Sequence, residues 1–284
     1  MQYTLLAFFL LLTTVIGAQT FEGLEGIYVE HYYQSNEMDN RAGNLSGELK
    51  TNSKTYRIFL DLSPGYRFQA AYGTLVHPLS FHSEAPFFNH AGIGNTYPNV
   101  IPERSLSKNI TLLDSWFTAG AAGESFMGVP KKFDLDDNLL SKKFEESYLI
   151  NDTKWMEYSL KERDGMHDSN DLPIVNLFQL DSTSKHLMMV TNSNHLEINN
   201  GAWACLGKGS IGVDSLGTNY VLIAQLTTAA ELDFELNIML GTPQGKSIKY
   251  VWSNPQQGEI LCPLLQGTTK KTKKKKTEQT KIKS

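Results

Sequence analysis

Residues 55–73, TYRIFLDLSPGYRFQAAYG, hold the pattern that decides the fold. The even-numbered positions from Tyr56 to Leu62 are all apolar, which is the period of a β-strand with one buried face. Pro64 presets the backbone for a turn, and Gly65 supplies the positive φ that a type II turn needs next. The alternation then resumes to the end of the stretch. Residues 55–73 therefore predict a β-hairpin, which we expect in the middle of a large sheet.

Segments of the same kind recur along the chain of 284 residues. Hydrophobic residues make up 40% of the sequence and aromatic residues 11%, which is enough for a substantial core. Clusters of Gly, Pro, Asn and Asp separate the segments, and the pattern indicates about a dozen short strands. The predicted fold class is therefore all-β, as a single large β-sandwich of jelly-roll type with long loops.

The most hydrophobic strands are expected late in the chain. Residues 220–228, YVLIAQLTT, are apolar on both faces, as in a central strand that is covered on both sides. In residues 232–240 apolar positions alternate with polar ones, so Asp233 and Glu235 share one face and lie about 7 Å apart. Such a carboxylate pair could be the acid and base of a glycosidase. It is also typical of the solvent-facing side of an antiparallel strand, which is the interpretation we favour.

The sequence divides into three parts: a signal peptide at residues 1–18, a β-sandwich domain at 19–265 and a Lys-rich tail at 266–284. Leu5 to Ile16 is an apolar run that is too short for a membrane span of about 20 residues. Small residues follow it, so cleavage after residue 18 is expected. We therefore predict a secreted, periplasmic or cell-surface protein with no transmembrane segment in the mature chain.

Charge is distributed unevenly between these parts. Residues 266–284 carry eight Lys and one Glu, a net charge of +7, and residues 1–20 carry none. The total of −4 therefore leaves −4 − 7 = −11 for residues 21–265. An acidic domain argues against nucleic-acid binding, which needs Lys and Arg on the folded surface. The tail is expected to be disordered, and either to contact anionic surfaces or to act as a solubilising end.

Two cysteines, Cys205 and Cys262, leave two alternatives open. In an exported protein the pair can form a disulfide bond. Free cysteines also pack in protein cores as small hydrophobic side chains.

Residues 134–145 resemble a calcium-binding loop in part. Asp134, Asp136 and Asn138 occupy positions 1, 3 and 5 of the pattern, and Glu145 occupies position 12. Position 6, however, is Leu139, where the sharp turn of such loops needs glycine. The alternative is a solvated helix start with acidic residues in its first turn. We therefore expect no cofactor and no tight calcium binding.

A long loop rich in Gly, Asn and Pro at residues 85–102 contains Phe87, Phe88 and Tyr97. Aromatic side chains on a loop can stack on sugars, or they can pin the loop to the core. We favour the second role for these three residues.

Several polar residues have side chains of the kinds that act as catalytic or metal-binding groups. His77, His82 and His90 do not have the spacing of a recognised zinc site. Asp114 lies within a predicted strand at residues 109–120, where it can accept hydrogen bonds from a neighbouring turn or act as a nucleophile or general acid. We expect the first role, because no nucleophile elbow occurs there.

Three stretches together resemble a family of uncharacterised, exported all-β proteins of Bacteroidetes. They are residues 55–73, residues 109–120 (NITLLDSWFTAG) and residues 220–243 (YVLIAQLTTAAELDFELNIMLGTP). The resemblance covers residues 24–265 and implies an exported protein. It brings no catalytic residue or cofactor with it.

The function expected from these observations is an exported, non-catalytic binding, extracellular-matrix or adhesion module. The sequence does not identify the ligand, and the partner considered is a polysaccharide or another envelope polymer. One alternative is a carbohydrate-active hydrolase or lyase that uses Asp and Glu. A second alternative is a structural protein of the cell envelope.

Overall fold

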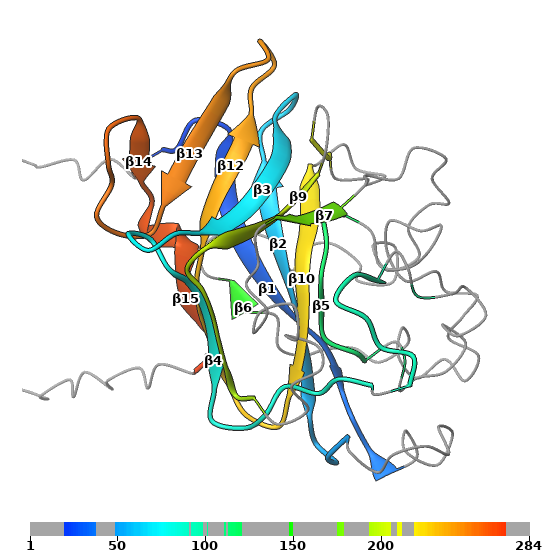
Figure 1. Ribbon diagram of the computed structural model, residues 1–284. Helices are drawn as coiled ribbons and strands as arrows, with labels where there is room; N and C mark the ends of the chain where they lie inside the picture. Colours follow the sequence, from blue (N-terminus) through cyan, green and yellow to red (C-terminus); the bar gives the residue numbers. More distant parts are fainter. Residues whose placement is uncertain are drawn as a thin grey trace, which may run out of the picture.

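The structure is a computed structural model that describes residues 20–37, 49–90, 92–98, 101, 111, 113–120, 148–149, 175–178, 193–205, 209–211 and 219–270. Within these residues the fold is all-β and consists of three sheets, which confirms the predicted fold class (Figure 1). The jelly-roll arrangement stays a prediction. So does the signal peptide at residues 1–18, which lies outside the described residues.

The first sheet, sheet A, has the strand order β5-β10-β2-β1-β6, and its neighbouring strands are antiparallel. Its strands are β1 (Leu24–Gln34), β2 (Lys54–Leu62), β5 (Trp116–Phe117), β6 (Tyr148–Leu149) and β10 (Tyr220–Thr228). Every residue of β10 is buried, as predicted for a strand covered on both faces.

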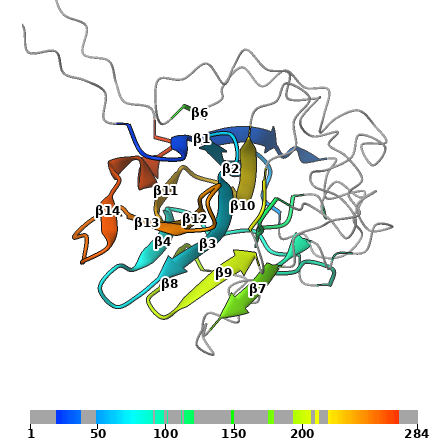
Figure 2. The same cartoon turned by 90° about the horizontal axis from the view of Figure 1, so that it is seen from above.

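The other two sheets lie opposite sheet A. Sheet B has the order β14-β13-β12-β3-β9-β7, and sheet C has the order β15-β11-β4-β8. In Figure 2, β1 and β2 lie along one side of the molecule and β8, β9 and β7 along the other. The strands of sheet B are β3 (Arg67–Gly73), β7 (Val175–Phe178), β9 (Gly201–Cys205), β12 (Asn237–Gly241), β13 (Ser247–Val251) and β14 (Glu259–Leu261). The strands of sheet C are β4 (Leu79–Ser83), β8 (His195–Ile198), β11 (Leu232–Glu235) and β15 (Gln266–Thr268).

Sheets B and C are two halves of one set of bent strands. The strands of sheet C, read in the order β15, β11, β4 and β8, continue into β14, β12, β3 and β9, which have the same order in sheet B. Only Leu236 separates β11 from β12, and two residues separate β8 from β9. Sheet B has two further strands, β13 between β14 and β12 and β7 beyond β9. The predicted continuous strand at residues 232–240 is therefore one strand shared by two sheets.

The predicted hairpin at residues 55–73 is wrong in its pairing. The turn exists, because Tyr66 N donates to Ser63 O at 3.1 Å and Gly65 has a φ of 85°. The strand before the turn, β2, lies in sheet A and the strand after it, β3, lies in sheet B. The turn thus carries the chain from one sheet to the other, and each strand lies in the interior of its own sheet. Alternation shows which side chains are buried, but a strand's neighbours are set by hydrogen bonds to distant segments.

One hydrophobic core contacts all three sheets. Phe117 of sheet A stacks on Trp203 of sheet B with ring centroids 4.2 Å apart and planes 10° apart. Phe81 of sheet C lies 5.4 Å from Phe117. Offset aromatic pairs at these distances add to the stabilisation from burial alone. The three sheets are therefore joined by shared packing.

Sheet A is also buried on its second face, where the sequence predicted a polar, half-buried strand. Arg57 is only 1% exposed, and its guanidinium lies 3.5 Å from the centre of the Tyr32 ring. Arg57 Nε donates to Gln225 Oε1 at 2.8 Å, and Gln225 Nε2 donates to Asp114 O at 2.6 Å. A buried charge of this kind is stabilised by the hydrogen bond of its Nε and by the aromatic ring beneath its guanidinium group.

The predicted boundary between the domain and the Lys-rich tail, at Gln266, lies too early in the chain. Residues Gln266–Thr268 form β15, which pairs with β11 at the edge of sheet C. Thr269 N donates to Leu232 O at 2.8 Å, and Thr269 Oγ1 accepts from Leu232 N at the same distance. Backbone pairing needs no apolar side chain, so composition did not reveal it. The fold extends to Lys270, and residues 271–284 lie outside the described residues.

Candidate functional site

The outward side of sheet C carries the polar residues that the alternation of its strands predicts. On β11, Leu232 and Phe234 are buried, whereas Asp233 and Glu235 are only partly covered. The prediction that these two carboxylates share one solvent-facing side is therefore confirmed. We name this surface the sheet C face, and it consists of Ser80, His82, His195, Glu197, Asp233, Glu235, Gln266 and Thr268.

Strand register arranges the sheet C face in two rows, because directly paired residues stand side by side. The first row runs from β15 to β8 as Thr268, Asp233, His82 and His195. The second row runs in the same direction as Gln266, Glu235, Ser80 and Glu197. Sequence reasoning found only the two β11 members, since the other members lie on distant segments, with Ser80 155 residues from Glu235 in the chain.

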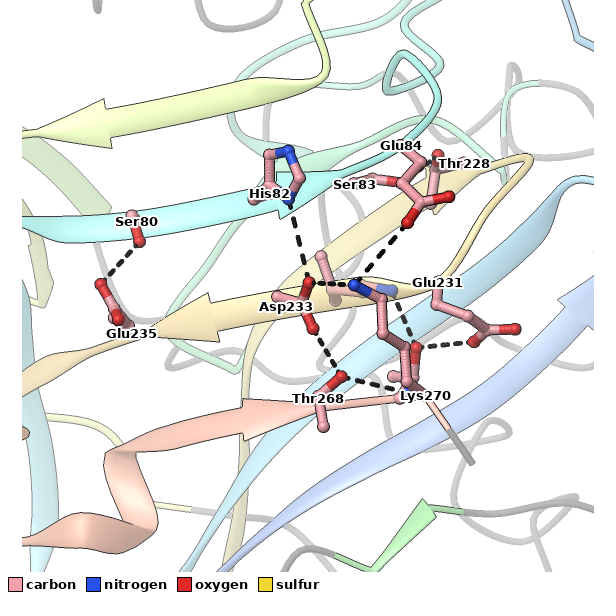
Figure 3. A network of polar contacts seen from close by, with 12 residues as sticks. Ser80, His82, Ser83, Glu84, Thr228, Glu231, Asp233, Glu235, Thr268 and Lys270 are labelled. Carbon is pink, nitrogen blue, oxygen red and sulfur yellow. Dashed lines mark hydrogen bonds and ion pairs between the residues drawn. The ribbon is translucent and has the colours of Figure 1, made fainter. Parts of the chain in front are cut away.

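Both carboxylates of β11 are held by hydrogen bonds (Figure 3). Thr268 Oγ1 donates to Asp233 Oδ1, and Lys270 Nζ lies 2.9 Å from Asp233 Oδ2. His82 Nδ1 is 3.8 Å from the same oxygen. Glu235 accepts from Ser80 Oγ at 3.1 Å and from Gln266 Nε2 at 3.0 Å.

These side chains line an open hollow of about 450 Å³. Ser80, His82, Asp233, Glu235, Gln266 and Thr268 contribute polar groups to its wall. Gly267 lies between the two β15 side chains and adds no side chain of its own. The hollow thus offers hydroxyl, imidazole, amide and carboxylate groups to a ligand that approaches from solvent.

The environment of Asp233 favours its charged form. Partial burial acts to raise its pKa, but the hydrogen bonds from Thr268 and Lys270 outweigh this, so the pKa is lowered overall. A glycosidase general acid needs the opposite, a carboxyl group whose pKa is raised. Asp233 therefore favours a negative charge that accepts hydrogen bonds, and its pKa is not raised as that of a general acid is.

Glu231 forms a second ionic contact beside the sheet C face. It accepts from Tyr56 Oη and Thr269 Oγ1, each at 2.8 Å, and it pairs with Lys54 Nζ. Burial acts to raise its pKa, but these donors lower it overall. The contact joins sheet A to the end of β15.

Asp114 has the structural role that the sequence predicted. Its Oδ1 accepts from His90 N at 2.7 Å and its Oδ2 from Asn95 N at 2.9 Å. Burial raises the pKa of Asp114 to about 7, although these hydrogen bonds oppose the shift. A Cβ atom on Gly94 would lie 2.6 Å from both carboxylate oxygens, so only glycine fits there. The carboxyl group therefore holds the backbone of His90 close to that of Asn95.

The remaining candidates of the long loop are also structural. Phe87 and Phe88 are 7% and 6% exposed, and Tyr97 packs against the core, which confirms that they pin the loop. His90 Nδ1 accepts from the backbone N–H groups of Gly92 and Ile93, each at 3.2 Å. Phe87 and Phe88 are therefore too deeply buried to stack on a sugar, whereas Tyr97 is only partly buried.

The two cysteines are buried free thiols and do not form a disulfide. Cys205 ends β9 and Cys262 follows β14, and sheet B places β3, β12 and β13 between those strands. A disulfide needs Cα atoms about 4.4–6.8 Å apart, whereas neighbouring strands alone are about 4.8 Å apart. Burial raises the pKa of Cys262 to about 11 and raises that of Cys205 as well, so neither thiol is activated as a nucleophile.

The predicted calcium residues Asp134, Asp136, Asn138 and Glu145 lie outside the described residues, so calcium binding there stays a prediction. In the part of the chain that the structure describes, no group of three or more His, Cys, Asp or Glu side chains is arranged to hold a metal ion. Nor does that part contain a helix long and apolar enough to cross a membrane.

Comparison with known proteins found no matching family model, no matching curated protein and no matching solved structure. The resemblance to exported proteins of Bacteroidetes therefore stays a prediction from the sequence.

Proposed function

We propose that the protein is an exported, non-catalytic binding module that holds a neutral polysaccharide on the sheet C face. The observation that carries this proposal is the open hollow of about 450 Å³ with six polar side chains in its wall. Sugar hydroxyls both donate and accept hydrogen bonds. The wall offers acceptors at Asp233 and Glu235 and donors at Gln266 and the hydroxyl groups.

The shape of the site suits an extended ligand. The hollow is open to solvent, and four strands cross beneath it. Three gaps of about 4.8 Å between strands make the face about 14 Å wide. A polymer can therefore cross several strands and contact both rows of side chains.

The charge of the face selects against anionic polymers. Asp233, Glu235 and Glu197 all point outward, and Glu84 follows at the end of β4. Lys270 is the one Lys or Arg within 4.0 Å of these carboxylates in the described part of the chain. Repulsion therefore disfavours sulfated or uronic-acid polymers, and a neutral sugar chain meets no such penalty.

The state of Asp233 supports binding over hydrolysis. Its lowered pKa keeps it ionised, and both of its oxygens already accept hydrogen bonds. Asp233 therefore does not have the raised pKa that the general acid of a glycoside hydrolase needs.

The test is affinity electrophoresis of the whole protein in gels that contain neutral or anionic polysaccharides, with release of reducing ends measured in parallel. We expect retardation by at least one neutral polymer, no release, and loss of retardation in the double variant Ser80→Ala/Glu235→Gln. The matched control is Gln69→Ala/Ser247→Ala, which removes a 2.8 Å side-chain hydrogen bond on sheet B instead. Retardation by anionic polymers alone, equal loss in the control, or release of reducing ends would each overturn the proposal.

A further inference from the structure

Lys270 connects the end of the fold to the sheet C face. Its Nζ lies 2.9 Å from Asp233 Oδ2 and 3.9 Å from Glu84 Oε1, and its backbone N donates to Thr268 Oγ1 at 3.1 Å (Figure 3). The hydrogen bond to Asp233, together with the negative charge of that carboxylate, raises the pKa of Lys270, which favours the charged ammonium group. The chain therefore leaves the fold at the rim of the hollow, with one lysine already bound there.

The face carries more negative charge than Lys270 neutralises, because its single ammonium group faces both Asp233 and Glu84. Glu84 and Glu197 have side chains 76% and 48% exposed, and Glu235 accepts only from uncharged donors. Lys54, the other lysine nearby, forms an ion pair with Glu231. A negative surface with unneutralised charge thus lies directly beside the point where the chain continues.

The residues that follow have the opposite charge. Residues 271–284 contain seven Lys and one Glu, a net charge of +6, and Ile282 is their single large apolar residue. A segment tethered at the rim meets the face at an effective concentration in the millimolar range, because binding becomes intramolecular. Several weak charge pairs then act together, and each weakens as the Debye length falls with added salt.

The segment is long enough to cover the whole face. Fourteen extended residues reach about 46 Å, whereas the four strands of sheet C span about 14 Å. Lys273 to Lys276 follow Lys270 by three to six residues, or about 10–20 Å of extended chain, which is enough to reach Glu235 and Glu197 on the far side of the hollow.

From these observations we infer that residues 271–284 dock along the sheet C face, with their lysines on Glu84, Glu197 and Glu235. The occupied face is then less accessible to any other ligand. This second consequence, competition with a polysaccharide, rests on the proposed function, whereas the docking itself does not.

Zero-length cross-linking of the full chain with a water-soluble carbodiimide tests the docking. The reagent joins lysine amines to carboxylates in contact, and mass spectrometry of the peptides identifies the pairs. At low salt we expect residues 271–276 to cross-link to Glu84, Glu197 and Glu235 at least fivefold more than to Glu25, an exposed carboxylate on β1. The preference should disappear in 0.5 M NaCl. Equal yields at Glu25, or a preference that survives high salt, would overturn the docking.

A second readout does not depend on cross-linking chemistry. The triple variant Glu84→Gln/Glu197→Gln/Glu235→Gln should make residues 271–276 more sensitive to trypsin, severalfold at low salt and not at high salt. Unchanged cleavage would contradict the proposal.

Ligand binding separates the two proposals. If a neutral polysaccharide retards the protein, deletion of residues 271–284 should strengthen that retardation severalfold at low salt only. If no polysaccharide binds either form, the proposed function fails and the cross-links still decide the docking. If residues 271–284 dock but their deletion leaves the retardation unchanged, the proposed competition with the polysaccharide is wrong.

Discussion

His77 Nε2 lies 2.7 Å from Glu259 Oε2, with the two side chains only 2% and 12% exposed. His77 belongs to the connection between β3 and β4, where sheet B bends into sheet C, and Glu259 begins the edge strand β14. Tyr72 lies close by, and burial together with the charge of Glu259 raises its pKa. The contact therefore fastens the bend between the two sheets to the edge of sheet B.

Replacement of His77 by alanine is expected to lower the free energy of unfolding by about 2–3 kcal/mol, because it leaves the Glu259 carboxylate largely buried without its partner. Chemical denaturation measures the loss, and a double-mutant cycle with Glu259→Gln isolates the coupling. The matched control is His195→Ala. Its side chain is 50% exposed, and its Nε2 lies 4.0 Å from Glu197 Oε2. A change there should stay below about 0.5 kcal/mol, and equal effects at both sites would contradict the prediction.

Asp114 should make the fold less stable as the pH rises from about 4 to about 7. Its pKa in the folded state is about 7, above the ordinary value of 3.8, so in this range the folded state binds a proton that the unfolded state has released. The free energy of unfolding therefore falls with pH, by up to about 1.4 kcal/mol for each pH unit. Asp114→Asn cannot ionise and should flatten this part of the profile. Denaturation curves between pH 4 and pH 8 measure the slope, and an unchanged slope in the variant would rule out this contribution.

Gly94→Ala should destabilise the protein by about 2 kcal/mol, since the added Cβ would meet both Asp114 oxygens and His90 O at 2.6 Å. Gly92→Ala is the control, because a Cβ there would lie 3.7 Å from the nearest atom of His90, an ordinary contact. Thermal melting of the two variants makes the comparison. Equal melting temperatures would show that the loop can move away from Asp114.

Truncation before β15 should lower the stability of the protein, whereas truncation after Lys270 should not. Removal of residues 266–284 deletes β15 and Thr269, and it exposes the edge of β11. We expect a loss of about 2 kcal/mol, which lowers Tm by roughly 4–8 °C in a domain of this size. Removal of residues 271–284 alone should leave Tm unchanged in 0.5 M NaCl. If both truncations melt alike, β15 contributes nothing to stability.

The sequence by itself determined which side chains face the core and which face solvent. The alternation from Leu232 to Glu235 placed Asp233 and Glu235 on one outward side, and the run at residues 220–228 indicated a strand covered on both faces. These inferences succeed because a period of two is a property of the extended backbone itself, so a few neighbouring residues are enough to reveal it.

The tertiary structure alone decided which strands lie side by side. It placed β2 and β3 in different sheets despite the turn between them, and it brought His82, Ser80 and Thr268 to the β11 carboxylates. It also paired β15 with β11 through backbone hydrogen bonds, which the side chains of β15 do not predict. Strand pairing depends on donors and acceptors that every residue carries, so the choice of neighbour comes from the packing of the whole core and not from any local pattern.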